Sequence, residues 1–509
     1  MFFLTPQVLN SDLTRGRCSA GDVKLLIVDE AHRALGDYAY CKAVRELVRA
    51  GAMTRIVALS ATPGSDISSV KKMIQNLCIS HIEIRQEDSP DIVPYTHKRT
   101  IDKIVIKISK DVNNIKLKLM SVLEIYTKKL SAAQAVTKGH LPSSYSKWIL
   151  INCRDQWRQA PAAGASKAVQ GVVEADFATA LNLYSGLELL LKQGLRSVYN
   201  FYTKTDINSS TKRIRGELYR IPAWREIMSY LGELYSGDTS NSLLNQGPAL
   251  SQAGSTRAVD LLQTVSTSHP KMDKLLEVVK DHFQNFVSDD RETKVIIFND
   301  KRDCVNELVA CLSKLKPLVR PKHFVGQASS ANSRGLNQKE QIEIVKRFKE
   351  GVYNTIVATC VGEEGLDIGE VDLIVLYDMK TSPISYVQRI GRTGRKRDGR
   401  VVVLVTEGVE EREYKTCLYQ VRTINKELQD QTRLENVLYS NAPRMIPRGL
   451  SPTVFIKEIN LKKLILIFPI EVSPHENDRE GLGAQAWSLR GQRTAHCRPG
   501  PCPRQGRRL

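Results

Sequence analysis

Residues 354–395 read NTIVATCVGEEGLDIGEVDLIVLYDMKTSPISYVQRIGRTGR, and this stretch decides the fold. It contains two short apolar runs, Thr355–Ala358 and Leu373–Tyr377, each followed by polar residues. Runs that are almost entirely aliphatic are typical of parallel strands buried on both faces. Ser382 followed by Pro383 predicts the N-cap and first turn of a helix. The stretch therefore predicts an α/β domain built on a parallel sheet.

The predicted helix continues through QRIGRTGR, residues 388–395. In a helix, Gln388, Arg392 and Arg395 would be spaced i, i+4 and i+7, and one face would present two guanidiniums beside an amide. Guanidiniums suit phosphate oxygens, and across a cleft from a nucleotide they can act as arginine fingers. The alternative is a solvated basic helix end, and the preceding GEEGLDIG sequence argues against it.

The composition describes a globular protein with an unusual charge. A chain of 509 residues is long enough for two or three domains, and a net charge of +19 indicates a polyanionic partner. A basic surface that serves only solubility is the alternative. No apolar run reaches the roughly 20 residues of a membrane span, and the start lacks the features of a signal peptide. Ten cysteines without CxxC pairs indicate neither zinc nor disulfides, which favours the cytosol or nucleus.

Polar motifs follow two apolar runs near the start of the chain. Val23–Val28 is followed at once by DEAH, residues 29–32, and Arg55–Leu59 is followed by SAT, residues 60–62. Open α/β sheets bind their ligands just beyond the carboxyl ends of strands. The two motifs are therefore expected to lie at one site.

These residue types suit magnesium-dependent hydrolysis of a phosphate bond. Asp29 can hold Mg²⁺ directly or through water, and Glu30 can orient or deprotonate the attacking water. His32 and the hydroxyls of Ser60 and Thr62 would link the state of the nucleotide to closure of the domains.

Composition and periodicity divide the chain into five parts. We expect an α/β segment over 1–94, a helical insert over 110–235, a flexible linker over 236–268, a second α/β domain over 270–440 and a disordered tail over 456–509. Basic and aromatic residues interleave in the insert, which suits a groove for a nucleic-acid backbone, although a helical core with solvated charges is the alternative. In the second domain, a strand over 401–405 is expected to close the sheet.

At this point a family resemblance is clear. Residues 358–368 and 388–395 resemble motifs V and VI of superfamily 2 helicases, and DEAH and SAT fit the same pattern. With a helical insert between two motor domains, residues 1–455 resemble the family of the archaeal Hef helicase and its vertebrate relatives. The resemblance implies two RecA-like domains, the first incomplete, and an ATP- and Mg²⁺-dependent DNA helicase or translocase that acts on forks and four-way junctions.

The resemblance also assigns roles to residues. Arg392 and Arg395 would reach the γ-phosphate, with Gln388 nearby, and Thr5, Gln7 and Thr359 would contact DNA. The residues that it places at the nucleotide are Asp29, which also binds the metal, Glu30, His32, Gly365, Asp367, Arg392 and Arg395.

One expected motif is missing. The superfamily carries a phosphate loop, GxxxxGK[ST], whose backbone amides and Lys cradle the phosphates, and no Gly-Lys dipeptide occurs here. We therefore expect a fragment or truncated gene model that starts inside the first motor domain and binds ATP weakly by itself. A non-catalytic scaffold that binds branched DNA is one alternative, and an RNA-sensing superfamily 2 helicase is another.

The resemblance implies a nuclear protein that takes part in replication-fork processing and the repair of interstrand crosslinks. Full-length members are expected to bind the Fanconi core complex and histone-fold proteins, but regions for these partners are not evident in this sequence. No membrane partner is expected.

Overall fold

The computed structural model describes residues 1–136, 139, 141–161, 166–203, 209–235, 269–287, 292–327, 335–363, 366–442 and 449–453. All but the last five of these belong to one unit, Met1–Met445. The predicted linker, 236–268, and the predicted tail, 456–509, lie outside the described residues. In the described part of the chain, no helix is long and apolar enough to cross a membrane.

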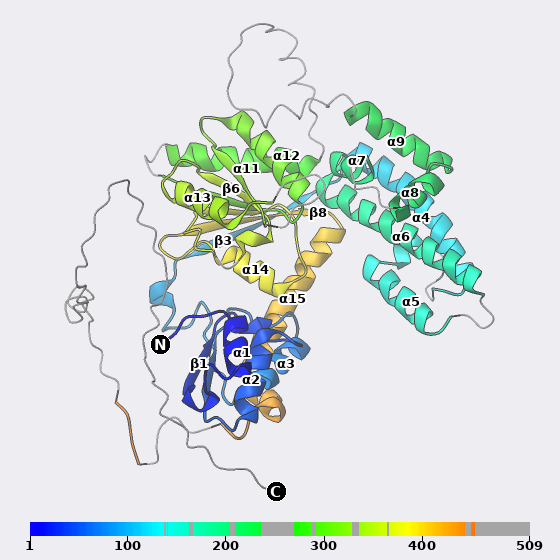
Figure 1. Cartoon of the computed structure of the whole chain (residues 1–509). Coiled ribbons are helices and arrows are strands. Elements are labelled where there is room, and N and C mark those ends of the chain that lie inside the picture. The colour runs from blue at the N-terminus through cyan, green and yellow to red at the C-terminus, as the bar shows by residue number, and fades with distance from the viewer. Residues whose placement is uncertain are drawn as a thin grey trace, which may run out of the picture. The chain divides into compact units, whose positions relative to one another are not determined.

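Six parallel strands form the larger sheet, in the order β3-β8-β7-β4-β6-β5. Figure 1 labels β3, β6 and β8 of this sheet. Every residue of β4, β6 and β7 is buried. This confirms the prediction that the aliphatic runs of residues 354–395 are covered on both faces. The bounds are Arg99–Ile106 for β3, Val295–Phe298 for β4, Pro321–Phe324 for β5, Thr355–Ala358 for β6, Leu373–Leu376 for β7 and Gly399–Thr406 for β8.

Helices cover both faces of this sheet. α11 and α12 pack on the face that carries Ile297 and Val375, whereas α13, α14 and α15 pack on the face that carries Ile296 and Ile374. Neighbouring residues of one strand point to opposite faces, which is why a single aliphatic run supplies both cores. The bounds are Pro270–Val287 for α11, Arg302–Leu312 for α12, Gln338–Lys349 for α13, Pro383–Ile390 for α14 and Val409–Gln429 for α15.

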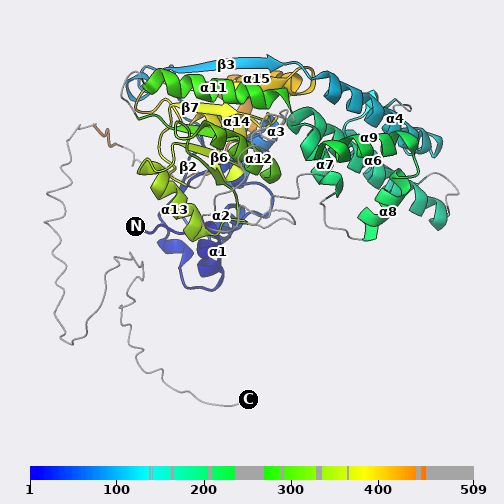
Figure 2. The same cartoon turned by 90° about the horizontal axis from the view of Figure 1, so that it is seen from above.

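The strand order corrects one prediction. The strand over 401–405 does not close the sheet, because β8 is followed by β3, which pairs with it from Arg99–Gly399 to Ile106–Thr406. Figure 2 shows β3 along the margin of the sheet. The partner residues of β3 lie 300 positions away in sequence, so local spacing gave no sign of the pairing.

The first segment is a smaller α/β layer. β1 (Leu25–Val28) and β2 (Arg55–Ala58) are parallel and in register, Leu25 with Arg55 and Val28 with Ala58. Its helices are α1 (Pro6–Thr14), α2 (Ala39–Arg49) and α3 (Ile67–Asn76). Short 3-10 turns occur at Ala20–Asp22, Ala31–Arg33 and Val93–Tyr95.

The core of the first segment includes the end of a helix from the second domain. Val28, Val44 and Ile74 are buried together with Ile424 and Leu428 of α15. The 3-10 helix η8 (Gln431–Val437) contributes Leu434 to the same core. The C-terminal part of α15 therefore packs into the core of the first segment.

The described residues of the insert form helices and their connections, and no strand occurs among them. Its helices are α4 (Lys110–Ala132), α5 (Lys147–Gln159), α6 (Lys167–Gln193), α7 (Leu195–Thr203), α8 (Ser209–Leu218) and α9 (Pro222–Tyr235). Serines cap three of them: Ser109, Ser146 and Ser166 each accept a bond from a first-turn amide. Gly186 of α6 allows close packing, because a Cβ there would lie 2.2 Å from the Tyr202 hydroxyl.

Candidate functional site

The DEAH carboxylates stand directly after β1. Asp29 is exposed, and its Oδ1 accepts a bond of 2.9 Å from the amide of Glu30. Glu30 has φ 49°, in the left-handed region that non-glycine residues adopt infrequently. The amide of Ala31 donates to the carbonyl of Leu59 at 2.9 Å, which fixes the turn against the end of β2. The strained turn thus holds both carboxylates at the carboxyl edge of the small sheet, where the sequence predicted them.

His32 joins the two motifs of the first segment. Its Nδ1 lies 3.4 Å from Ser60 Oγ and 3.4 Å from Glu30 Oε2. Burial and the nearby Arg33 lower the pKa of His32, while Asp29 acts in the opposite direction. Thr62 is also buried. The structure therefore brings His32 and Ser60 together, as required if DEAH and SAT act at one site.

The arginine motif differs from its prediction. α14 begins as expected, with Ser382 accepting from the amide of Ser385, but it ends at Ile390 with Gly391 as its C-cap. Arg392 and Arg395 therefore lie beyond the helix, and the predicted face that they share with Gln388 does not form. Gly394, with φ 77°, helps to turn the chain away from the helical path.

Arg392 is held by backbone carbonyls. Its Nη1 donates to Leu366 O at 2.9 Å and its Nη2 to Glu363 O at 2.6 Å. Burial and the neighbouring Arg395 lower the pKa of Arg392, while Asp367 and Glu30 act in the opposite direction.

Arg389 is a functional candidate that the sequence reasoning passed over. Its side chain is 2% exposed and forms ion pairs with Asp300, Glu363 and Asp378. These carboxylates come from three separate places along the chain. The only sequence signal was a charged residue on the apolar side of a short helix, which is rarely buried unless it is paired.

The remaining predicted residues are placed as follows. Asp367 is exposed, and its Oδ2 accepts a 2.6 Å bond from Lys349, which lowers its pKa. Thr359 is 4% exposed, so its side chain offers little surface to a phosphate in this conformation. Gln388 is half-buried on α14. Gly365 lies outside the described residues.

Thr5 and Gln7 lie at the start of α1, and both are exposed. Thr5 occupies the N-cap position but makes no side-chain capping bond. Because a helix N-terminus presents amide donors, this end remains compatible with the predicted contact to a phosphate.

A cavity of about 530 Å³ lies between the SAT residues of the first segment and α14 of the second domain. Ser60 and Thr62 line it from the first segment, and Tyr386, Val387 and Ile390 line it from α14. The SAT residues Ser60 and Thr62 and the helix α14 therefore face one common cavity.

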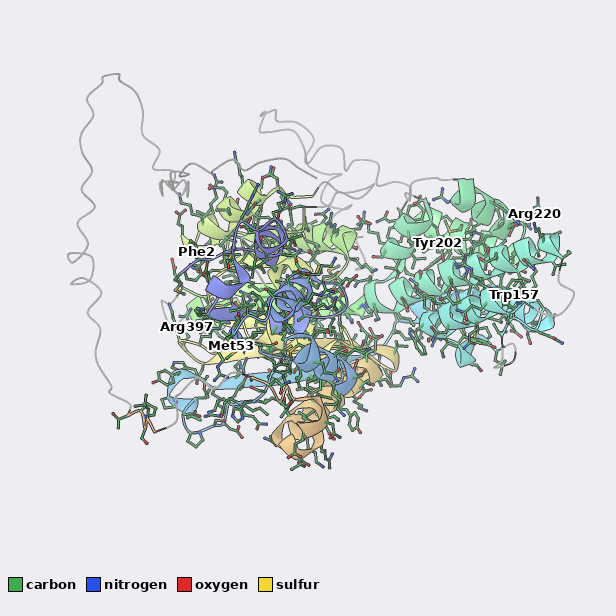
Figure 3. All side chains as sticks on the ribbon, turned by 60° about the horizontal axis from the view of Figure 1, so that its bottom comes forward. Phe2, Met53, Trp157, Tyr202, Arg220 and Arg397 are labelled. Atoms are coloured by element: carbon green, nitrogen blue, oxygen red, sulfur yellow. The ribbon has the colours of Figure 1, made fainter. Side chains whose placement is uncertain are left out.

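The aromatic residues of the insert divide into two groups. Trp157 and Tyr202 are buried, and Figure 3 shows both within the helices of the insert. Trp148, in contrast, is 70% exposed on α5, and Tyr219 is 48% exposed. Some of the basic residues are paired: Arg154 and Arg158 both bind Glu174 and hold the pKa of that carboxyl at about 2. The exposed rings are therefore the ones that a nucleic acid could stack on.

The residues present fit one part of a magnesium–nucleotide site. Asp29 and Glu30 offer carboxylate oxygens, which Mg²⁺ prefers, and the Arg392 guanidinium suits a phosphate. Bound Mg²⁺ would neutralise phosphate charge, with Asp29 as its protein ligand. The loop that normally cradles the phosphates is not found in this sequence.

Comparison with known families gives two matches. The DEAD/DEAH box helicase family matches residues 1–70, and the helicase conserved C-terminal domain family matches residues 271–397. The first range contains DEAH and SAT, and the second contains the arginine motif. The first segment and the six-stranded domain are therefore RecA-like helicase domains.

Individual proteins resemble the whole arrangement. The chain is 41% identical over 474 residues to the Fanconi anemia group M protein of Gallus gallus, covering 91% of this chain and 23% of that protein. It is 34% identical over 476 residues to the ATP-dependent DNA helicase mph1 of Neurospora crassa, covering 91% of this chain and 37% of that protein. The chain thus spans less than half the length of either relative.

A solved structure covers nearly the same region. The crystal structure of the Pyrococcus furiosus Hef helicase domain aligns with a TM-score of 0.54 and 31% identity, over 81% of this chain and 77% of that one. The likeness therefore extends over most of this chain and most of the solved helicase domain.

Proposed function

The chain belongs to the Hef-like family of superfamily 2 helicases, and on this basis we propose that it is motor machinery of an ATP-dependent DNA helicase or translocase. The observation that carries the proposal is the cavity that residues of both motor domains line. Ala31 of DEAH and Ser60 and Thr62 of SAT border it from the first segment, and α14, which leads into Arg392, borders it from the second domain. A space bordered by both domains is what a nucleotide site between two domains requires.

Within this proposal we assign each residue a role. Asp29 would hold Mg²⁺, Glu30 would orient the attacking water, and Arg392 would stabilise charge on the γ-phosphate. The contact between His32 and Ser60 would let the DEAH turn and the SAT turn move together when the domains close. Arg395 is exposed beyond Arg392, where a phosphate could reach it.

Branched DNA is the substrate that we propose. Support comes from the net charge of +19, from the helical insert between the motor domains, and from the exposed rings of Trp148 and Tyr219 on that insert. Forks and four-way junctions present several duplex arms at once, and a motor with a separate helical insert can contact more than one arm. The corresponding biology is fork processing and crosslink repair in the nucleus, with the Fanconi core complex and histone-fold proteins as partners of a full-length protein.

A hydrolysis assay tests the motor role. We expect slow, Mg²⁺-dependent ATP hydrolysis in the presence of forked DNA, reduced about 10²–10⁴-fold by Glu30→Gln, because the water would lose its base. Glu46→Gln, a change at a half-exposed position of α2, is the matched control and should leave the rate unchanged. If no hydrolysis occurs while fork binding persists, this chain acts as a DNA-binding scaffold, which the missing Gly-Lys motif makes the second candidate.

A binding comparison tests the substrate. Forked DNA and double-stranded RNA of equal length and charge, at two salt concentrations, separate a DNA motor from an RNA sensor. We expect tighter binding to the fork, with a salt dependence that reflects phosphate contacts. Preference for the RNA would overturn the choice of substrate.

A further inference from the structure

The turn between α6 and α7 of the insert is joined to the second domain by buried polar contacts. The carbonyl of Leu191 accepts from His269 Nε2 at 3.1 Å and from Thr406 Oγ1 at 3.0 Å. Lys192 forms an ion pair of 2.8 Å with Glu413 of α15. α6 ends at Gln193, and its C-cap Gly194, with φ 97°, lets the chain turn directly into α7. The end of the helix is thus anchored in the motor domain.

Gln193 makes the most central of these contacts. Its side chain is 3% exposed, and its Oε1 accepts a bond of 2.8 Å from Asn299, which is fully buried at the end of β4. Its Nε2 donates to Asp378 Oδ2 at 3.3 Å, just beyond β7. The one amide therefore uses both its acceptor and its donor on residues that follow two neighbouring strands of the sheet.

Asp378 in turn holds Arg389. Arg389 Nη1 lies 3.4 Å from Asp378 Oδ1, and the same guanidinium binds Asp300 and Glu363. Lys380 is the other cation in contact with Asp300 and Glu363. Three carboxylates thus share two cations, which leaves a surplus negative charge in a mostly buried cluster.

The surplus charge makes neutral donors to Asp378 important. Burial and the charge of Asp300 raise the pKa of Asp378, while Arg389 lowers it. Asp378 Oδ2 accepts from the amide of Asp300 at 2.8 Å and from Gln193. Without the Gln193 amide, the Asp378 carboxylate would lose one of its hydrogen-bond donors. Its interaction with Arg389 would then weaken.

Arg389 and Arg392 share a partner. Glu363 Oε1 accepts from Arg389 Nε at 2.9 Å, and the carbonyl of the same Glu363 accepts from Arg392 Nη2 at 2.6 Å. A shift of Arg389 would therefore move both the helix that leads into Arg392 and the carbonyl that holds its guanidinium.

We propose that Gln193 is a positioning residue that transmits the placement of the helical insert, through Asp378 and Arg389, to the arginine finger Arg392. The proposal rests on the motor function proposed above and adds to it a route from the DNA-contacting insert to the nucleotide side. When DNA moves the insert, the end of α6 shifts the donor on Asp378, and α14 with Arg392 responds.

Hydrogen exchange of the whole chain, without DNA, tests the mechanical link. Gln193→Met keeps the volume of the side chain but removes its donor and its acceptor. We expect the amides of 383–390 to exchange about tenfold faster than in the wild-type chain. Lys192→Met, which breaks the neighbouring ion pair of the same joint, should change the exchange of 383–390 by less than about twofold. If Gln193→Met speeds exchange only around 190–200, the hydrogen bonds of Gln193 act only locally and the proposal is overturned.

A second variant, and hydrogen exchange measured with forked DNA, extend the test. Gln193→Ala also removes the volume, and a purely packing role predicts that it alone affects 383–390. Forked DNA should slow exchange of 383–390 in the wild-type chain, and Gln193→Met should lose this response while it still binds the fork. An equal response in both chains overturns the proposal. If the wild-type chain does not bind the fork, the proposed function fails, and the DNA-free comparison still decides the role of Gln193.

Discussion

Arg389 Nη2 donates to Asp300 Oδ1 at 2.5 Å, and this contact ties the arginine helix α14 to the loop that follows β4. The two residues are 89 positions apart in sequence. Because the guanidinium is 2% exposed and also binds Glu363 and Asp378, it is a buried, paired charge and not a solvated one.

We expect Arg389→Met to lower the free energy of unfolding by about 3–5 kcal/mol, because it leaves the buried Asp378 without its cation and Asp300 and Glu363 with Lys380 alone. Urea denaturation at pH 7 measures the change. Arg347→Met is the matched control: that arginine is half exposed and pairs with Glu343 one helical turn away, so its loss should cost less than about 1 kcal/mol. Equal losses in both variants would show that Arg389 is not a structural anchor.

Lys271 and Glu410 form an ion pair in which both side chains are fully buried. Glu410→Leu alone should destabilise the protein by about 3–5 kcal/mol, because it leaves the Lys271 ammonium group in the core without its carboxylate partner. Lys271→Met with Glu410→Leu should recover more than half of that loss, since no buried charge remains. A double-mutant cycle by urea denaturation measures both effects. Additive losses in the cycle would contradict a coupled pair.

His282 predicts a pH dependence of stability. Its Nε2 donates at 2.8 Å to Thr293 Oγ1, which itself donates to Asp372. Burial lowers the pKa of His282 to about 4, with Arg400 and Arg397 acting in the same direction and Asp372 against it. The folded protein therefore keeps the imidazole neutral, whereas the unfolded chain takes up a proton below about pH 6.5.

The direction of the pH dependence follows from this difference in proton binding. The stabilisation is complete above about pH 6.5 and is lost as the pH falls towards 4, because the unfolded state binds more protons. Between pH 7 and pH 5, the wild-type chain should lose about 2 kcal/mol more than His282→Gln. Urea denaturation at both values measures the difference. Identical pH profiles of the two proteins would refute the assignment.

Trp148 and Trp157 should behave in opposite ways. Trp148 is 70% exposed, and Trp148→Ala should weaken the binding of forked DNA by about 1–3 kcal/mol, with little effect on folding. Trp157 is 6% exposed, and Trp157→Ala should lower the free energy of unfolding by about 3–5 kcal/mol. Fluorescence anisotropy with a labelled fork, together with urea denaturation, separates the two. Unchanged fork binding by Trp148→Ala would remove that ring from the DNA surface.

The sequence by itself determined the features that depend on near neighbours. The aliphatic runs Thr355–Ala358 and Leu373–Leu376 predicted buried parallel strands, and Ser382 with Pro383 predicted the start of α14. The DEAH carboxylates fall at the end of β1, as predicted, because strand length and the onset of polar residues are both local properties. The family was also readable, since its motifs are short and their order along the chain is fixed.

Only the tertiary structure decided what depends on partners far away along the chain. β3 joins β8 across 300 positions, the end of α15 completes the core of the first segment, and Gln193 reaches Asp378 across 185 positions. α14 ends at Ile390 and so separates Arg392 from Gln388. Whether a charge such as that of Arg389 lies in solvent or in the core is set by three-dimensional neighbours, because burial and pairing act through distance in space and not along the chain.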